Sequence, residues 1–583
     1  MSAVQQLLTE HLDIWSAAET EQKSGRGRSS ANGSSVYGIR KLRKLILELA
    51  VRGKLVPQDA SDEPASELLK RIQAEKARLI AEGKIRKDKP LAKLKPDEAP
   101  YQLPDGWEWV RFGDIAEHNS GKTLDNGRNT GTLHDYITTS NLYWGKFELA
   151  NVRQMLIRDE ELEKCTARKD DLLICEGGEA GRAAVWSYDN DICFQNHVHR
   201  ARFYCDIDPY YAFRFFEKLD ATGEINEYRK GVGISNMSGK ALASIVLPLP
   251  PFAEQHRVVA KVDELMALCD QLETRHSSAA DTHEKLVRQL LATLTQSSSA
   301  ADFAANWQRI AAHFDTLFCT EASIDALKQT LLQLAVMGKL VPQDPHDEPA
   351  GELLKQIQAE KARLIAEGKI KKEKSFAAIT EQEKPFQVPN GWEWCRAEYI
   401  SAIIVDCPHS TPKFVGSGML CVDTNSIKQG RLVAHKIRYV DSETFFDRNR
   451  RLTPKTGDIV FAREGSVGES FVIPEGMECC LGQRVMLFRP SNRINPEYFR
   501  LSLSEPGSLN RILELHKGIG AKHVNVADMR AALVSLPPFL EQNFIVAKID
   551  QLMALCDQLK ARIAEATHLQ QKLADVLVEQ AVA

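Results

Sequence analysis

The stretch "GKLVPQDASDEPASELLKRIQAEKARLIAEGKI" occupies residues 53–85, and "GKLVPQDPHDEPAGELLKQIQAEKARLIAEGKI" occupies residues 338–370. Of these 33 aligned positions, 29 are identical, at a separation of 285 residues (338 − 53). Chance does not produce such identity, so the chain contains an internal duplication. This repeat decides the fold, because it divides the chain into two halves that follow the same plan.

A second pair of similar segments closes each half. "LPPFAEQHRVVAKVDELMALCDQLETR" (249–275) returns as "LPPFLEQNFIVAKIDQLMALCDQLKAR" (536–562). The stretches between the repeats share only short signals, such as "PDGWEW" (104–109) and "PNGWEW" (389–394). Drift after duplication would blur all parts of the chain alike. We therefore interpret the chain as two similar frames that hold two different inserts.

The frames are predicted to be helical. Val258, Val262, Leu265, Cys269 and Leu272 recur at spacings of 4, 3, 4 and 3, as in a coiled-coil seam, and a helix is expected to begin after Pro250-Pro251 and Pro537-Pro538. The first repeat predicts helices near 40–51 and 325–336, a corner at "GKLVPQD", and a second helix that ends near Gly83. We expect "TQSSSAAD" (295–302) to interrupt the central helices and residues 24–35 to be flexible.

The inserts alternate short apolar runs with glycine-rich turns, as in "DLLICEGG" and "GDIVFAREG", which is typical of mixed α/β structure. The predicted fold is therefore α+β, with two mixed α/β domains held in frames of long repeated coiled-coil helices, and with internal pseudo-two-fold symmetry from the duplication. The predicted regions are 1–105 (helical), 106–245 (first insert), 246–390 (helical), 391–533 (second insert) and 534–583 (helical).

Composition narrows the classes of function. The net charge of −4 gives no support to a nucleic-acid partner, and no apolar run approaches the roughly 20 residues that span a bilayer. The 12 cysteines are scattered without a CxxC pair, which favours reduced thiols in the cytoplasm over zinc ribbons or disulfides.

Motifs of catalysis and metal binding are incomplete. "NSGKT" (119–123) lacks the first glycine of a phosphate-binding loop, because that position holds Ala116. His197 and His199 lie on one strand face, but the second insert has "GQRVMLFR" in that place, so metal ligands would not recur. We expect no catalytic residues, no metal and no cofactor bound by this chain.

Two different inserts in repeated helical frames, each closed by "LPPFxEQ" and a leucine-rich helix with "KGxG" ahead of it, resemble the specificity (S) subunit of type I restriction-modification enzymes. The "GKLVPQD…DEPASELLKRIQAEKA" frame is most similar to the type IB branch. The resemblance implies that each insert is a target recognition domain for one half of a split site in double-stranded DNA. It also implies that the long frame helices form an antiparallel coiled coil, which separates the two domains. The frames would dock two methyltransferase (M) subunits, which use S-adenosylmethionine. Motor-nuclease (R) subunits, expected in two copies, would use ATP and magnesium, and the S chain would catalyse nothing.

Helix length fits such a site. A helix of about 22 residues, such as Glu254 to Arg275, spans ~33 Å, close to the ~34–36 Å of one DNA turn. Two different readers also predict two different half-sites. The alternatives are a helical scaffold that bridges protein partners without reading DNA, and an enzyme with an unrecognised site.

Base and phosphate contacts favour polar and basic side chains on loops. In the first insert the candidates are Lys122, Thr123, Arg182, Asn196, His197, Arg200, Lys230, Ser235, Asn236 and Lys240. In the second insert they are His409, Ser410, Thr411, Lys413, Arg463, Ser466, Gln483, Arg484, Lys517, Lys522, His523 and Asn525. The first insert has 17 Lys/Arg and 22 Asp/Glu, a net of −5, so its basic residues must cluster or its partners must attract the phosphates.

Overall fold

The computed structural model describes residues 11, 14–15, 36–85, 91, 94, 98–125, 127–231, 235–370, 375–514 and 523–582. The chain forms two compact units. Unit 1 comprises Met1–Ala279 and Ala566–Ala583, and unit 2 comprises Ala280–Glu565. The segment predicted to be flexible, 24–35, lies outside the described residues.

The helical part of unit 1 is built on α3 (Tyr37–Val51) and the first half of α9 (Phe252–Gln296). Val258 and Val262 of the predicted seam are fully buried here, together with Ala574 from the end of α19 (Phe539–Val582). Arg43 of α3 contacts Asp270 at 2.6 Å, whereas Gln58, just beyond α3, contacts Glu254 at 3.1 Å. The start of α3 thus faces the later turns of α9, and the two helices run antiparallel.

Unit 2 repeats this arrangement with α12 (Glu321–Val336) and the first half of α19. Lys560 contacts Asp325 at 2.9 Å, and Gln343 contacts Glu541 at 3.1 Å, so α12 runs antiparallel to α19. The last turns of α9, with α10 (Ala300–Ala311) and α11 (Phe314–Leu317), complete this helical core.

The long helices begin where the sequence predicts, directly after the paired prolines, and α9 ends at Gln296 inside the predicted break. Their length was underestimated, because α9 has 45 residues and α19 has 44, about twice the predicted helix. The stretch of α9 directly after Arg275 is polar, but no proline or glycine interrupts the helix. Its last turns then bury a second apolar face with Val287, Leu291 and Leu294.

Unit 1 carries a mixed α/β domain between β1 (Glu108–Arg111) and β14 (Val246–Leu249), which pair antiparallel and which we take as the ends of domain 1. One sheet has the order β10-β8-β12-β2, formed by Ala183–Val185, Leu172–Cys175, Val198–Phe203 and Ala116–Ser120. The other has the order β6-β3-β11-β7, formed by Arg153–Ile157, Thr132–Ile137, Ile192–Phe194 and Thr166–Ala167. Two short strand pairs complete the domain: β4-β5 (Leu142–Tyr143, Lys146–Phe147) and β9-β13 (Gly177–Gly178, Ser235–Asn236). Its helices are α5 (Phe112–Ile115), α6 (Asp159–Cys165), α7 (Pro209–Thr222), η2 (Glu224–Glu227) and α8 (Gly239–Ser244).

Domain 2 of unit 2 lies between β15 (Glu393–Arg396) and β26 (Leu533–Leu536), which also pair antiparallel. Its first sheet, β16-β25-β22-β23, is formed by Ser401–Asp406, Val485–Pro490, Ile459–Ala462 and Ser470–Val472. The second, β17-β21-β18-β24, is formed by Phe414–Val415, Arg438–Val440, Met419–Val422 and Cys479–Leu481. The remaining elements are the pair β19-β20 (Ile427–Lys428, Arg431–Leu432), α14 (Ala397–Ile400), η4 (Thr424–Ser426), η5 (Ala434–Lys436), α15 (Ser442–Arg448), α16 (Pro496–Ser504), α17 (Pro506–Glu514) and α18 (Val526–Ala531).

Both domains keep the same ion pair in their first sheet. Arg202 contacts the buried Asp171 at 2.7 Å in domain 1, and Arg489 contacts the buried Asp458 at 2.7 Å in domain 2. The two inserts, which share few residues, therefore share a fold. This confirms the prediction of two mixed α/β domains with long helices between them.

The repeated motifs meet in one cluster in each unit. The Trp107 indole donates to the buried Glu254 carboxylate at 2.9 Å, and Gln58 of "GKLVPQD" donates to the same carboxylate at 3.1 Å. In unit 2, Trp392 and Gln343 donate to Glu541 at the same two distances. "GKLVPQD" is thus a structural corner that joins the "GWEW" strand to the start of the long helix.

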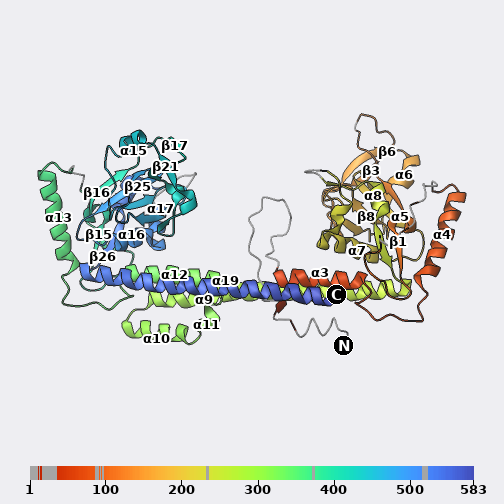
Figure 1. The fold of residues 1–583 in the computed structure, drawn as a ribbon, viewed down its shortest axis with the longest axis horizontal. Coiled ribbons are helices and arrows are strands. Elements are labelled where there is room, and N and C mark those ends of the chain that lie inside the picture. Colours follow the sequence, from red (N-terminus) through yellow and green to blue (C-terminus); the bar gives the residue numbers. More distant parts are fainter. Residues whose placement is uncertain are drawn as a thin grey trace. The chain divides into compact units, whose positions relative to one another are not determined.

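The second helix of each repeat, α4 (Ala65–Ala81) or α13 (Ala350–Ala366), packs on its recognition domain. Ala65, Leu68 and Ile72 are buried in the main core of domain 1, and Figure 1 shows α4 beside β1 and α5. The matching face of α13 is buried in the core of domain 2. Each helix ends just before a glycine with positive φ, as predicted for Gly83.

Candidate nucleic-acid interface

Four segments of domain 1 meet at one end of the sheet β10-β8-β12-β2. The backbone amide of Asn196 donates to the Lys122 carbonyl at 3.0 Å, and the backbone amide of Glu176 donates to the His197 carbonyl at 2.8 Å. The Met237 amide donates to the Glu176 carbonyl at 2.8 Å. We call this surface the loop face of domain 1. Its first three segments are residues 120–123, 176–182 and 195–197, and the fourth is described at residues 230–231 and 235–240.

Domain 2 has an equivalent loop face. The Arg463 amide donates to the Arg484 carbonyl at 2.9 Å, and the Val524 amide donates to the Arg463 carbonyl at 2.9 Å. The Cys407 amide donates to the Val485 carbonyl at 3.3 Å, as the Gly121 amide donates to the Val198 carbonyl at 3.2 Å in domain 1. Residues 406–413, 463–469, 482–484 and 523–525 form this face. The same backbone connections therefore bring the same four segments together in both domains.

The structure gathers most residues predicted for domain 1 on its loop face. The exposed ones are Thr123, His197, Lys230, Asn236 and Lys240, and the half-buried ones are Lys122, Arg182, Asn196 and Ser235. Lys230 and Lys240 make no ion pair with any residue that the structure describes in this region.

The prediction for Arg200 is wrong. Its side chain is 1% exposed, and its guanidinium donates to the carbonyls of Glu163 and Thr166 at 2.9 and 2.8 Å. Arg200 lies on β12, which is covered on both faces, so its side chain points into the protein. It holds the end of α6 against the sheet and cannot reach DNA.

Some other candidates of domain 1 are held by neighbours. Lys122 contacts Glu161 at 2.5 Å, and Arg182 contacts Glu179 at 2.7 Å and the Thr139 carbonyl at 2.6 Å. The Lys122 ammonium and the Arg158 guanidinium together hold the pKa of Glu161 down at about 2, with the contribution of Arg158 the larger. Acidic partners thus offset part of the positive charge on this face.

Domain 2 exposes a different set of side chains. His409, Ser410, Thr411, Lys413, Ser466, Arg484 and Asn525 are exposed, and Gln483 and His523 are half-buried. Asn525 accepts the Asp528 amide at 2.9 Å as the N-cap of α18, and Ser466 donates to the Thr424 carbonyl at 3.0 Å. Lys517 and Lys522 lie outside the described residues.

Arg463, another residue predicted to contact DNA, is also buried. Arg463 is 9% exposed, and its guanidinium contacts the Asp406 carboxylate at 3.2 Å. It supports the loop face from within and joins two of the four segments.

Sequence reasoning missed Arg448, the last residue of α15. Its buried guanidinium donates to four carbonyl oxygens, those of Pro408, Ser410, Leu481 and Gly482, at 3.2, 3.1, 2.5 and 2.9 Å. These carbonyls belong to the two segments that carry His409 and Gln483. Nothing in the local sequence marks this arginine, because its partners lie more than 30 residues away.

One position in the loop face has opposite charge in the two domains. Glu176 and Arg463 make the same backbone bonds after equivalent strands, but one is an acid and the other a base. Beside Glu176 lies buried His199, whose pKa is lowered by burial. His199 is therefore neutral at pH 7 and does not compensate the acidic side chain.

Two kinds of site are absent from the described residues. No group of three or more His, Cys, Asp or Glu side chains is placed to hold a metal ion in that part of the chain. No helix within it is long and apolar enough to cross a membrane.

Comparison with known proteins decides the family. The model of the type I restriction modification DNA specificity domain matches residues 104–280 and 428–568. The chain is 37% identical over 590 residues to the type I restriction enzyme EcoAI specificity subunit of Escherichia coli, with 100% of both chains covered. The EcoEI specificity subunit of the same organism is 37% identical over 622 residues, again with 100% of both chains covered.

The chain belongs to the type I restriction-modification specificity subunits. The resemblance seen in the sequence is thereby confirmed, as is the prediction of a non-catalytic specificity subunit with two target recognition domains. Among solved structures, an HsdS subunit from Thermoanaerobacter tengcongensis aligns with 83% of this chain and 98% of its own, at 18% identity and a TM-score of 0.41.

Proposed function

We propose that this specificity subunit reads a two-part, asymmetric sequence in double-stranded DNA, with one loop face on each half-site. This proposal rests on one observation: the two loop faces share the same backbone hydrogen bonds but carry different side chains. Equal backbones would let both faces approach DNA in the same way, and base edges are read by the side chains that a loop presents. Unequal side chains, Glu176 against Arg463 among them, would then select unequal half-sites.

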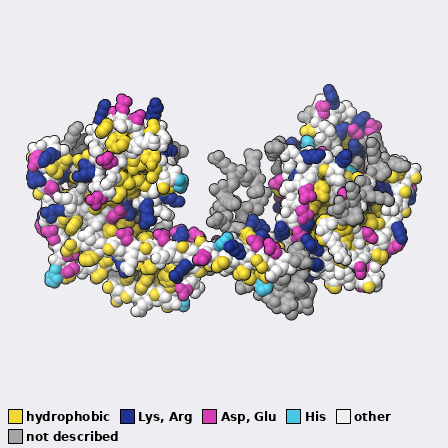
Figure 2. All heavy atoms as spheres, viewed as in Figure 1, with side chains coloured by type: hydrophobic (Ala, Val, Ile, Leu, Met, Phe, Trp, Pro, Cys, Tyr) yellow, Lys and Arg dark blue, Asp and Glu magenta, His cyan; other side chains and the backbone are white. Residues whose placement is uncertain are grey.

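The proposal assigns phosphate contacts to the exposed lysines of each face and to partner subunits. Figure 2 shows Lys and Arg side chains mixed with Asp and Glu side chains on the visible face of the molecule. Domain 1 has a net charge of −5 over residues 106–245, so the lysines at 230 and 240 act against an acidic background. The basic surface of a partner would supply the remaining attraction to the DNA backbone.

The repeated frame supports two equivalent docking sites, one for each of two methyltransferase subunits. Each unit repeats the cluster of tryptophan, glutamine and glutamate and the antiparallel helix pair. S-adenosylmethionine would be bound by these methyltransferase subunits, and ATP and magnesium by two motor-nuclease subunits. This chain would contribute the choice of sequence and the spacing between half-sites, which the length of α9 and α19 would set.

The test is to replace residues 391–533 with a second copy of residues 106–245 and to map methylated adenines in host DNA that carries the complete enzyme. We expect the hybrid to modify a site whose two halves are identical and inverted, with the first half-site unchanged. A hybrid that assembles and methylates at the original asymmetric site would overturn the assignment of one domain to each half. Methyl transfer by this chain without a methyltransferase subunit would overturn its role as a non-catalytic reader.

A further inference from the structure

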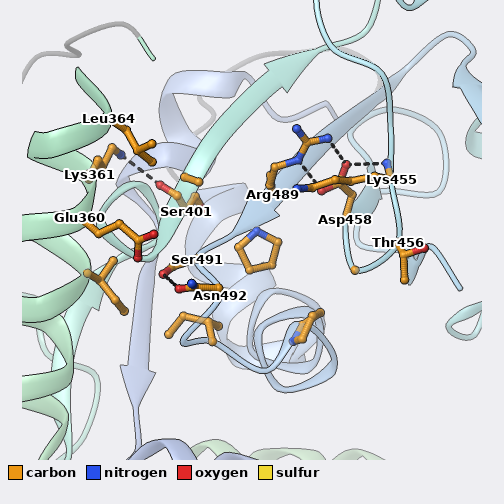
Figure 3. Close-up of a pocket in the computed structure, with 16 residues that line it drawn as sticks. Glu360, Lys361, Leu364, Ser401, Lys455, Thr456, Asp458, Arg489, Ser491 and Asn492 are labelled. Carbon is orange, nitrogen blue, oxygen red and sulfur yellow. Dashed lines mark hydrogen bonds and ion pairs between the residues drawn. The ribbon is translucent and has the colours of Figure 1, made fainter. Parts of the chain in front are cut away.

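A cavity of about 490 Å³ opens in unit 2 between α13 and one end of the first sheet of domain 2. Figure 3 shows Glu360, Lys361 and Leu364 of α13 on one side and Asp458 and Arg489 on the other. Ser491 and Asn492 lie along one edge of the same space. Its volume is within the range of sites that hold small organic molecules, and it is distinct from the loop face.

Domain 1 has the same backbone around the equivalent place. The Ser491 amide donates to the Ile400 carbonyl at 2.9 Å, and the Tyr204 amide donates to the Ile115 carbonyl at 3.2 Å. These residues follow equivalent strands, β25 and β12, and precede equivalent helices, α16 and α7. Position 491 in domain 2 therefore corresponds to position 204 in domain 1.

The lysine on the opposite wall is also equivalent. The Lys361 ammonium donates to the Glu398 carbonyl at 2.7 Å, and the Lys76 ammonium donates to the Gly113 carbonyl at 2.9 Å. Both lysines project from the second frame helix toward the short helix that follows the "GWEW" strand. The two walls of the cavity thus have direct counterparts in domain 1.

The counterparts differ in what lies between the walls. In domain 1 the Tyr204 ring packs partly buried against the core, with the Lys76 ammonium 5.2 Å from its centroid. The preceding Phe203 ring packs edge-on to Phe112 at 6.1 Å. In domain 2 the two aromatic residues are replaced by Pro490 and Ser491, and both of these residues line the cavity.

We propose that the cavity of domain 2 is a binding site for a single aromatic ring supplied from outside the chain, in the place that Tyr204 occupies in domain 1. The Lys361 ammonium, which also donates to the Glu398 carboxylate at 2.6 Å and to the Ser401 carbonyl at 3.1 Å, would lie beside the ring. Ile357 and Leu364 would contact the edge of the ring. The ring belongs either to a small free molecule or to an aromatic side chain of a bound partner subunit. The chemistry at the cavity is the same in both cases.

The first experiment uses p-cresol, the tyrosine side chain as a free molecule, with binding to the purified full-length chain measured by saturation-transfer NMR. We expect p-cresol to bind the wild type, and Ser491→Tyr to weaken this binding by about tenfold or more because the new ring fills the cavity. Ser491→Ala is the matched control and should bind as the wild type does. Tyr204→Ser should create a second p-cresol site, because it opens the equivalent space in domain 1.

The second experiment separates the two sources of the ring in the complex with methyltransferase subunits. If a partner side chain fills the cavity, the complex should not bind p-cresol, and Ser491→Tyr should weaken assembly by about tenfold. If the ring belongs to a free molecule, the complex should still bind p-cresol and Ser491→Tyr should assemble normally. Absence of p-cresol binding to the isolated wild-type chain, or equal binding to Ser491→Tyr, would overturn the proposal.

Discussion

The two units differ least at the frame and most at the loop face. Trp107 and Trp392 meet their glutamates at the same distance of 2.9 Å, whereas the equivalent positions 176 and 463 carry opposite charges. The frame is held by side chains, so its residues cannot change without loss of a buried hydrogen bond. The loop face is held mainly by backbone hydrogen bonds, so its side chains are free to change. This difference in how the two regions are held explains how one fold carries two loop faces with different side chains.

The largest expected effect tests the frame. Gly53 and Gly338 have φ of +67° and +68°, and a Cβ at either would lie 2.5 Å from a proline Cγ, of Pro104 or Pro389. Gly53→Val and Gly338→Val should each lower the free energy of unfolding by about 3 kcal/mol or more, through backbone strain and overlap. Urea denaturation of the full-length chain measures this loss, which should be similar in the two halves.

The matched control is Gly83→Ala. Gly83 also has positive φ, at +70°, but a Cβ there would meet no atom within 4 Å. It should cost only the backbone strain, about 1 kcal/mol. If Gly53→Val were no worse than Gly83→Ala, or if it assembled normally and changed the methylated sequence, the frame role of "GKLVPQD" would be wrong.

A smaller effect should separate the two loop faces. Arg448→Met removes the donor for four carbonyl oxygens in domain 2 and should cost about 3 kcal/mol, since unpaired buried acceptors are left behind. Arg200→Met removes the donor for two carbonyl oxygens in domain 1 and should cost about 2 kcal/mol. Under the proposed function, DNA footprinting should show that Arg448→Met loses protection of one half-site and Arg200→Met weakens the other. Loss of the same half-site in both variants would contradict the assignment of one domain to each half.

These two arginines also show what the sequence can and cannot predict. The duplication, the corner and the mixed α/β inserts were predictable, because periodicity and repetition are local or self-comparing signals. The antiparallel pairing of the helices was predicted from the resemblance to the family. Arg200 was misplaced because it was chosen by residue type and by its nearness to a turn, whereas β12, on which it lies, is covered on both faces. Arg448 was missed because its role depends on carbonyls brought together by tertiary folding. Loop residues such as Lys230 and His409 were found because turns on equivalent strands place them at the same end of a sheet.

The next expected effect concerns the charge of the loop face in domain 1. Lys230 and Lys240 are exposed there, and a lysine that binds a phosphate adds about 0.9 to the slope of log affinity against log salt. The double variant Lys230→Ala/Lys240→Ala should reduce the magnitude of the slope of log affinity against log salt by about 0.9 for each phosphate contact that is lost. Fluorescence anisotropy of the complex on DNA at a series of salt concentrations measures this slope. Lys169→Ala is the control, because Lys169 lies beyond the opposite end of β8 and pairs with Asp189. An equal decrease of the slope in the control would place the phosphate-binding lysines elsewhere.

The smallest expected effect tests whether the two frames are energetically as well as geometrically alike. Burial raises the pKa of both Glu254 and Glu541, against the hydrogen bonds that Gln58 and Trp107, or Gln343 and Trp392, donate to them. A carboxyl group whose pKa is higher in the folded than in the unfolded chain contributes stability that is fully present below its unfolded pKa, near 4.5. That contribution is lost as the pH rises through the folded pKa. Glu254→Gln and Glu541→Gln should each remove an equal part of the gain in stability on acidification from pH 7 to 4.5, and the double variant should remove the sum. Urea denaturation at a series of pH values measures this. If only one of the two single variants reduced the gain in stability on acidification, the two glutamates would have different surroundings despite their equal hydrogen-bond distances. The difference between the two units would then begin at the frame.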